Sequence, residues 1–387
     1  MIADEALPRK SRLAALLDHF AAVEDPRDVR RILHPLPEVL LLVVCGSIAD
    51  CDDYEDIAAW GAAHLDFLRR HLPYANGVPG ERWLTILMNR INPALFAAAF
   101  AAWVRESWPE KAGLVAIDGK TSRRSHDRSA GAPPLHLVSA FATTARLVLA
   151  QEAVPDKANE LAAIPPLLER LGADQGLKGA LVSIDAIATN AEVARAIAAQ
   201  GADWLLAVKA NQPTLRAEVE AAFVAAGDRI ETHTDLDKAH GRIEERRTAV
   251  LRQLDWLEGP RRFPGEFRLP GTACLVRAET RVESKGATRT ETRFFASSRA
   301  LSAADAAAAI RGHWAIENRL HWVLDVTFAD DQSRLRKGHG ARNMATVRHF
   351  ALNLVRTAQD KKSIKSRRKI AGWNPNYLNA ILASQPT

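Results

Sequence analysis

Apolar residues recur at helical spacing through the first part of the chain. The pattern is clearest in residues 36–49, 54–70 and 93–103. Proline and glycine interrupt it, as in residues 73–79. No cluster of catalytic side-chain types accompanies these segments. We therefore expect residues 1–110 to form a helical accessory domain.

Near residue 113 the pattern changes to short apolar runs of strand length. Strands are predicted at 114–117, 135–142, 147–154, 179–184 and 204–208, with helices at 160–171 and 191–199. The order β-β-β-α-β-α-β is typical of the start of an RNase H-like fold, whose mixed sheet places the first and fourth strands side by side and parallel. We therefore predict an α/β protein with an RNase H-like catalytic domain over residues 111–358.

A β-rich insertion is predicted inside that domain, at about residues 212–300. Alternating apolar and polar positions mark strands at 246–251, 273–282 and 290–296. A long helix is expected over 302–326, with Ser302 as its N-cap, and another over 341–358. Residues 359–387 are left as a basic C-terminal segment.

Composition narrows the class of protein. Hydrophobic residues make up 47% of the chain and charged residues 25%, as in ordinary globular proteins. The three cysteines are too few and too scattered for a disulfide framework or a CxxC zinc site, which favours a reducing cytoplasm. The longest apolar run, residues 36–49, contains Pro37 and Glu38 and is too short to cross a bilayer. We expect a cytoplasmic protein without a membrane partner.

Positive charge is concentrated at the C-terminal end. Residues 331–387 hold twelve Lys and Arg against Asp331 and Asp360, a balance of +10 within a chain whose net charge is +6. A basic end on a mildly acidic body favours nucleic acid as the partner. From charge alone, a solvated tail that binds nothing is an equal alternative. Residues 361–369, with six basic residues in nine, are expected to be mobile or to contact DNA.

Two aspartates occupy equivalent positions. Asp118 follows Leu-Val-Ala-Ile and Asp185 follows Leu-Val-Ser-Ile, each at the predicted end of a buried strand. If these strands are neighbours, the two carboxylates repel each other unless a cation lies between them. Oxygen ligands of this kind suit Mg²⁺ or Mn²⁺. For either residue alone, an Asp that merely caps a strand is the better interpretation; the matching pair favours a site.

Glu317 is the candidate third carboxylate. It lies at the edge of the apolar stripe of helix 302–326, with His313 and His321 one turn away on either side. The alternative, equally supported for Glu317 alone, is that it pairs with Arg319 or a nearby histidine. Other acidic residues compete for the same role, namely Asp325, Asp330 and Asp331.

Three carboxylates that hold two metal ions suit phosphodiester chemistry. One ion activates water or a 3′-hydroxyl, and the other stabilises the leaving oxygen. The chain has no Walker A motif, HExxH motif or convincing Ser/His/Asp elbow, which argues against other common hydrolase sites.

Basic residues near these carboxylates in sequence are candidates for holding phosphates. They are Lys120, Arg123, Arg124 and Arg128, then Arg334, Arg336, Lys337, Arg342 and Arg348. A solvated basic face is the less favoured alternative. Trp314 and Trp322 flank Glu317 and could stack on a flipped base, although packing in the core is the favoured interpretation.

Together these motifs resemble the ISAs-type, H-repeat-associated DDE transposases over nearly the whole chain. The matching blocks are Asp25-Pro-Arg, His34-Pro-Leu, Asn76-Gly-Val-Pro, Ala116-Ile-Asp-Gly-Lys-Thr, Leu135-His-Leu-Val-Ser-Ala-Phe, Lys157-Ala-Asn-Glu, Ser183-Ile-Asp-Ala, Ala207-Val-Lys-Ala-Asn-Gln-Pro, His240-Gly-Arg-Ile-Glu, His313-Trp-Ala-Ile-Glu-Asn, His321-Trp, Leu324-Asp-Val, Arg342-Asn and Ala351-Leu-Asn-Leu.

The resemblance implies a function and its parts. Asp118, Asp185 and Glu317 would be the catalytic, metal-binding triad, with Mg²⁺ or Mn²⁺ as two ions. The partners would be the terminal inverted repeats of an insertion sequence and a target DNA, with the protein a homodimer on paired ends. Lys209 would join the DNA-binding residues, and His313, His321 and Asp325 would be auxiliary.

This sequence also departs from the family pattern. Ile187-Ala-Thr-Asn stands where the family has a Met-Gly-Cys-Gln-like stretch. Ile310, His313 and Leu324 replace the Tyr, Arg and Lys of an outer motif in related transposases. His240, Arg242 and Glu244 have no derivable role beyond an ion pair in a turn and strand. Two alternatives to a transposase stay open: an RNase H-like nuclease without strand transfer, and a degenerate copy that only binds DNA.

Overall fold

The computed structural model describes residues 10–109, 113–126, 131, 133–227, 230–239, 242–252, 254, 268–284 and 287–384. The helices at the N-terminal end are α1 (Arg12–Ala21), α2 (Leu36–Ile48), α3 (Tyr54–Ala63), α4 (Leu65–Leu68), α5 (Glu81–Met88) and α6 (Pro93–Ser107). The accessory region is therefore helical, as its apolar spacing predicted. Among the described residues no single helix is both long and apolar enough to cross a membrane, although α5 and α6, bent by 91°, pass that test as a pair.

A nine-stranded sheet forms the centre of the molecule, in the order β3-β2-β1-β4-β5-β9-β8-β7-β6. Its strands are β1 (Leu114–Thr121), β2 (His136–Ala142), β3 (Leu147–Val154), β4 (Leu181–Ile184), β5 (Asp203–Val208), β6 (Glu231–Ala239), β7 (Arg242–Leu251), β8 (Cys274–Ser284) and β9 (Ala287–Ser297). β1 and β4 are parallel neighbours, and β1 and β2 are antiparallel. The predicted α/β, RNase H-like arrangement of the first five strands is confirmed.

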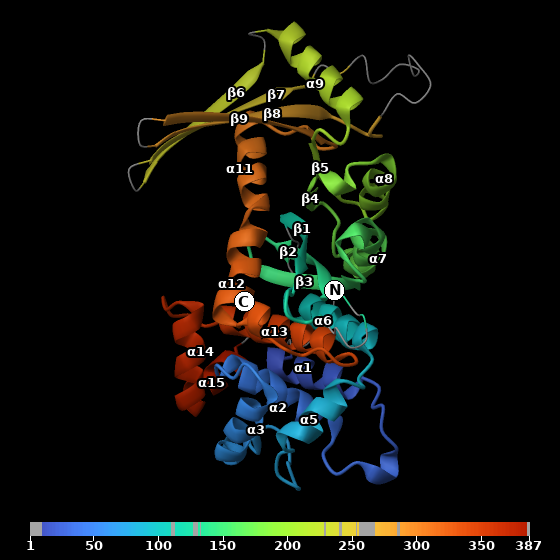
Figure 1. The fold of residues 1–387 in the computed structure, drawn as a ribbon, viewed down its shortest axis with the longest axis vertical. Coiled ribbons are helices and arrows are strands. Elements are labelled where there is room, and N and C mark those ends of the chain that lie inside the picture. The colour runs from blue at the N-terminus through green and yellow to red at the C-terminus, as the bar shows by residue number, and fades with distance from the viewer. Residues whose placement is uncertain are drawn as a thin grey trace, which may run out of the picture.

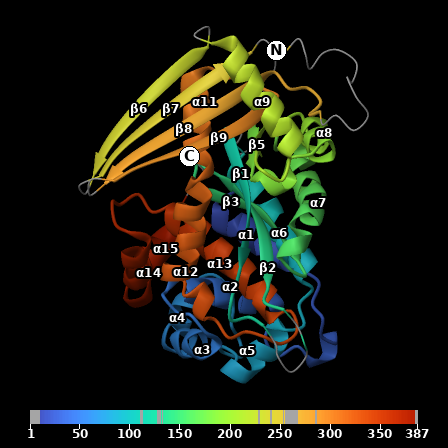
Figure 2. The same cartoon turned by 45° about the horizontal axis from the view of Figure 1, so that its top comes forward.

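The insertion continues this same sheet. β9 pairs antiparallel with β5, and β8, β7 and β6 follow as an antiparallel meander that projects from the body (Figures 1 and 2). The helix α9 (Pro213–Ala226) lies against one face of these strands and α11 (Ala303–His313) against the other. Neither β6 nor α9 was predicted from the sequence. In β6, polar residues occupy both faces, so the strand shows no alternation of apolar and polar positions.

Helices cover both faces of the central strands. α7 (Glu160–Gly172) and α8 (Ala191–Ala199) pack on one face, while α13 (Gly340–Arg356) and the N-terminal helices share a second core on the other. Residues of that second core reach into the segment around Glu317, namely Ile316, Leu320 and Leu324. The division into domains 1–110, 111–358 and 359–387 stays a prediction.

The helix expected over residues 302–326 is interrupted. α11 ends at His313, Glu317–His321 forms a π-helical turn, and α12 (Trp322–Thr327) follows. The prediction of one continuous α-helix was wrong, because apolar spacing does not reveal a local widening of the helix. The widened turn begins at Glu317, the candidate third carboxylate, and ends at His321, the candidate auxiliary histidine.

The basic C-terminal segment is folded. α14 (Ile364–Trp373) and α15 (Pro375–Leu382) pack beside α2 and α13 (Figure 1). Arg368 is fully buried, paired with Asp50 and Asp52 at 3.1 and 3.0 Å and stacked on Phe328. The expectation that residues 361–369 are mobile or contact DNA was therefore wrong for Arg368, whose charge is neutralised inside the protein.

We predict that Arg368→Met lowers the free energy of unfolding by about 4 kcal/mol, because it leaves Asp50 and Asp52 without their buried cation. Urea denaturation followed by circular dichroism measures this change. The matched control is Lys369→Met at the adjacent exposed position, which should stay within about 0.5 kcal/mol of the parent. Equal stability of the two variants would contradict a structural role for Arg368.

Candidate active site

Two neighbouring strands position Asp118 and Asp185. Parallel pairing of β1 with β4 ends at Ile117 and Ile184, so the two aspartates are the next residues on adjacent strands. Asp185 follows the end of β4, as predicted. Asp118 does not end its strand: β1 continues to Thr121, because β2 pairs with it beyond the end of β4.

Asp118, Glu317 and His321 converge on one place. One ligand atom from each residue lies within 4.8 Å of the others. The His321 Nδ1 is 3.6 Å from an oxygen of Asp118 and 3.6 Å from an oxygen of Glu317. His321 is buried, whereas Glu317 is half-exposed. Two carboxylates and an imidazole at this spacing form a group that could hold a divalent metal ion, with an opening to solvent on the Glu317 side.

The charges of this group act strongly on one another. Burial raises the pKa of Asp118 to about 6, and the Glu317 charge adds to that rise, while His321 and the Gly119 N–H oppose it. Hydrogen bonding to His321 is the largest cause of a lowered pKa at Glu317. The Asp118 carboxylate is therefore poorly solvated and lies beside a second anion, which is the setting that a bound cation relieves.

Asp185 lies next to this group but is turned to another partner. Its Oδ1 accepts a hydrogen bond of 2.6 Å from the Lys209 Nζ. Burial alone would raise the Asp185 pKa, but this bond and the Ala186 N–H outweigh burial and lower it. The structure thus brings Asp118 and Glu317 together, while the Asp185 oxygens are outside the group of ligand atoms within 4.8 Å of one another.

A pocket of about 330 Å³ opens beside Asp185, with Lys209, His313 and Trp314 in its wall. The His313 Nδ1 is 3.0 Å from the Ser183 Oγ on β4. Burial lowers the pKa of His313, and the charges of Asp185 and Glu317 act against that shift. His313 therefore shares the pocket wall with Asp185, and its lowered pKa favours the neutral imidazole.

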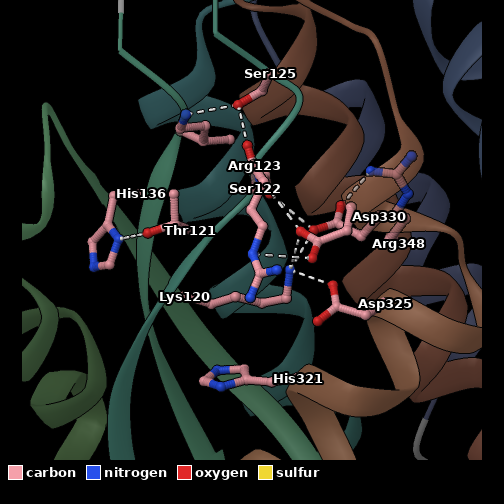
Figure 3. A network of polar contacts seen from close by, with 12 residues as sticks. Lys120, Thr121, Ser122, Arg123, Ser125, His136, His321, Asp325, Asp330 and Arg348 are labelled. Carbon is pink, nitrogen blue, oxygen red and sulfur yellow. Dashed lines mark hydrogen bonds and ion pairs between the residues drawn. The ribbon is translucent and has the colours of Figure 1, made fainter.

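Lys120 is held in a separate acidic cluster (Figure 3). Its Nζ lies 2.6 Å from Asp325, 2.9 Å from Asp330 and 3.7 Å from Asp331. DNA binding by Lys120 stays a prediction, and the structure does not favour it, because the side chain is 10% exposed and its charge is paired with these carboxylates. Asp325 faces Lys120, so it is not part of the Asp118 group.

The same cluster includes two further buried partners. Asp330 accepts hydrogen bonds from Ser122 Oγ and from Arg348 on α13. The expectation that Arg348 holds a phosphate was wrong, because its side chain is 4% exposed and paired inside the protein. Lys120 lies two residues after Asp118, and Asp325 lies on α12 just after Glu317's turn, so the cluster fixes one side of the site against the other.

The remaining predicted phosphate contacts are mostly on the surface. Arg123 is 83% exposed, although its guanidinium lies 3.7 Å from Asp331. The other exposed side chains are Arg124, Lys209, Arg334, Arg336 and Lys337. The Arg336 Nε donates to the Arg124 carbonyl, which joins the two basic segments. Arg342, at the start of α13, is exposed as well, and Arg128 lies outside the described residues.

Trp314 and Trp322 are exposed, by 43% and 57%. The favoured expectation that they pack in the core was wrong, because the apolar stripe of this segment is made by Ile316, Leu320 and Leu324 instead. The Arg293 guanidinium lies 5.0 Å from the Trp314 ring centroid. Both indoles are therefore partly open to solvent.

The sequence analysis did not identify the buried ion pair between His136 and Glu160, which lies next to Gly119. The His136 Nε2 lies 2.6 Å from a Glu160 oxygen, and the His136 Nδ1 lies 2.7 Å from the Thr121 Oγ1. A Cβ at Gly119 would meet the Glu160 carboxylate at 2.4 Å and the His136 Nε2 at 2.6 Å, so a larger residue would have to displace this pair. The available signals were the blocks of the resemblance that contain His136 and Glu160, namely Leu135-His-Leu-Val-Ser-Ala-Phe and Lys157-Ala-Asn-Glu. In the insertion, Arg242 and Glu244 form the expected ion pair at 2.8 Å, while His240 lies outside the described residues.

Comparison with known proteins finds matches over nearly the whole chain. Residues 109–354 match the family described as "Transposase DDE domain", and residues 17–104 match "DDE_Tnp_1-associated". The chain is 32% identical over 378 residues to "H repeat-associated putative transposase YhhI" of Escherichia coli (strain K12), covering 96% of this chain and 98% of that protein. It is 34% identical over 380 residues to "Putative transposase YncI" of Escherichia coli O157:H7, covering 96% and 95%. Among solved structures it aligns with a chain of "Cryo-EM structure of piggyBac transposase synaptic complex with hairpin DNA (SNHP)", with a TM-score of 0.42 and 8% identity over 96% of this chain and 79% of that chain.

We predict that Lys120→Met lowers the free energy of unfolding by about 3 kcal/mol, because Asp325 and Asp330 lose a buried cation. Urea denaturation is the measurement. Lys337→Met removes the same charge from an exposed position and should change stability by no more than about 0.5 kcal/mol. A Lys120 variant as stable as this control would show that the cluster does not hold the strand in place.

Proposed function

Because this chain belongs to the DDE transposase family, we propose that it cuts DNA at the ends of an insertion sequence and joins those ends to target DNA. The observation that carries the proposal is the convergence of Asp118, Glu317 and His321 beside the ends of two parallel strands. The family match covers residues 109–354, which include all three of these residues and Asp185. The resemblance seen in the motifs is thereby confirmed at the level of the family.

We propose Asp118, Asp185 and Glu317 as the catalytic carboxylates and as the ligands of Mg²⁺ or Mn²⁺. The crowding of Asp118 and Glu317, each 3.6 Å from the His321 imidazole, supports a cation at this place. Two such ions would supply activation of the attacking hydroxyl and stabilisation of the leaving oxygen. Asp185, which accepts a hydrogen bond from Lys209 in this structure, would be the third ligand, and Lys209 would then be available to contact a DNA phosphate.

The histidines have supporting roles in this proposal. His321 contacts both Asp118 and Glu317 and orients their carboxylates. His313, held by Ser183 on β4, lines the pocket beside Asp185, and its lowered pKa favours the uncharged imidazole there. Asp325 acts only through Lys120, as part of the cluster that holds β1 against α12.

The exposed basic side chains supply the DNA contacts. Arg123, Arg124, Arg334, Arg336 and Lys337 form a solvent-facing basic surface, and the bond between Arg336 and Arg124 shows that its two segments are adjacent. Phosphate contacts of this kind fix the position of the duplex without reading its sequence. The exposed rings of Trp314 and Trp322 offer stacking faces for bases next to the cleaved bond. Two copies of the chain would hold a pair of element ends.

Cleavage of a duplex carrying the element end should depend on added Mg²⁺ or Mn²⁺ and on Asp118 and Glu317. We expect Asp118→Asn and Glu317→Gln each to slow cleavage about 10³-fold or more, equivalent to about 4 kcal/mol of activation free energy. Binding of the uncut duplex, followed by fluorescence anisotropy, should change little. Asp174→Asn, at an 88% exposed carboxylate away from the site, is the control. Cleavage by the Asp118 variant at the parental rate would refute the assignment.

A strand-transfer assay with the same purified proteins distinguishes a transposase from a nuclease. A pre-cut element end with a free 3′-hydroxyl, incubated with a supercoiled plasmid and Mn²⁺, should give joined products with the parent and none with Asp118→Asn. Efficient cutting without joined products would favour the nuclease alternative, and DNA binding without either reaction would favour a degenerate copy.

A further inference from the structure

A second basic surface lies away from the carboxylates, in a groove of about 820 Å³ along α11. Leu114 and Leu181, the first residues of β1 and β4, line it, so it lies at the opposite end of these strands from Asp118 and Asp185. Small residues of α11 and its end, including Ala308 and Gly312, make up part of the wall and allow a close approach. None of the phosphate contacts predicted from the sequence lies here.

The arginines that line the groove outnumber the carboxylates that line it. Its lining residues include one carboxylate, that of Asp305, and four arginines. The arginines are Arg146, Arg299, Arg311 and Arg319. Arg299 pairs with Asp203 at 2.8 Å and Arg311 with Asp235 at 3.1 Å. Within the part of the chain that the structure describes, Arg146 and Arg319 have no carboxylate within ion-pair distance, and both are exposed.

A third guanidinium lies directly beside these two. The Arg356 side chain donates to the main-chain carbonyls of both Arg146 and Arg319 and lies 5.2 Å from the Phe141 ring centroid. Burial, with smaller contributions from the charges of Arg146 and Arg319, lowers the pKa of Arg356 to about 9. Three cations gathered without a carboxylate are unfavourable unless an anion binds among them.

The backbone at Arg146 adds an independent observation. Arg146 lies in the turn between β2 and β3 with φ at +58°, a conformation that glycine adopts without strain and that an arginine adopts at a cost of about 1 kcal/mol. This conformation directs the Arg146 carbonyl to Arg356 and leaves the Arg146 guanidinium exposed at the groove. Strain of this kind at an exposed charged residue points to a role for its side chain.

We propose that this groove binds the phosphodiester backbone of DNA, with Arg146 and Arg319 contacting phosphates and Arg356 fixing their main chains. The inference rests on the proposed function, because it assumes that DNA lies near Glu317, two residues from Arg319. Arginine is suited to the role, since its planar guanidinium binds phosphate through paired hydrogen bonds. The groove would hold DNA along α11, at the ends of β1 and β4 opposite to those that carry Asp118 and Asp185.

The test is a double variant, Arg146→Gly with Arg319→Gln. Glycine relieves the strained turn, and the Arg319 carbonyl that binds Arg356 is retained, so the fold is preserved. Arg82→Gln with Arg195→Gln removes the same charge from exposed positions on α5 and α8 and is the matched control. Anisotropy measures binding of two duplexes, one that ends in the element's terminal repeat and one of unrelated sequence, over a range of salt concentrations.

Loss of two phosphate contacts should reduce the slope of log affinity against log salt by about 2 for at least one duplex, relative to the control. If the groove holds the element end, binding and cleavage of that duplex weaken together. If it holds target DNA, cleavage stays normal while joining to the plasmid falls. Unchanged slopes for both duplexes, in a preparation whose parent binds and cleaves DNA, would overturn the groove proposal alone. A parent chain that binds neither duplex would overturn both this inference and the proposed function.

Discussion

The main constraint on this structure is the electrostatic repulsion between the carboxylates of Asp118 and Glu317, which lie close together near the ends of β1 and β4. Asp118 on β1 and Glu317 in the π-helical turn share one partly buried place with His321. Burial and the neighbouring anion make the Asp118 carboxylate unstable as an isolated charge, as its pKa of about 6 shows. The surrounding contacts hold the two side chains in this arrangement and prevent them from moving apart.

Two acidic clusters lie next to each other, and they differ in how far basic side chains balance their negative charge. Residues Asp118 and Lys120 project from the same face of β1, because side chains two apart on a strand share a face. Around Lys120, the carboxylates of Asp325, Asp330 and Asp331 meet Lys120 and Arg348, so their charge is largely balanced within the protein. Around Asp118 and Glu317, among the described residues, His321 is the basic side chain within ion-pair distance. The balanced cluster joins β1 to α12 and α13, and the unbalanced one faces outward through Glu317.

Much of this arrangement could be predicted from local sequence. The apolar runs that precede Asp118 and Asp185 identified β1 and β4, and their order along the chain indicated that they pair in parallel. The partners of buried charges could not be predicted in this way. Lys120 and Arg348 were expected to bind phosphate, and residues 361–369 to be mobile, because a sequence shows that a residue is basic but not which distant carboxylate it meets. The same limit applies to the widened turn at Glu317 and to β6, whose polar residues follow no apolar period.

The central claim is that Asp118 and Glu317 form a place for a divalent cation, and metal-dependent thermal unfolding tests it most directly. Ligands that bind only the folded state raise its stability by an amount set by their concentration and affinity. Added Mn²⁺ should raise the melting temperature of the parent chain progressively, and Glu317→Gln should abolish that rise while the metal-free melting temperature changes little. If Mn²⁺ raised the melting temperatures of the parent and the Glu317 variant equally, or raised neither, the carboxylate pair would not be a metal site.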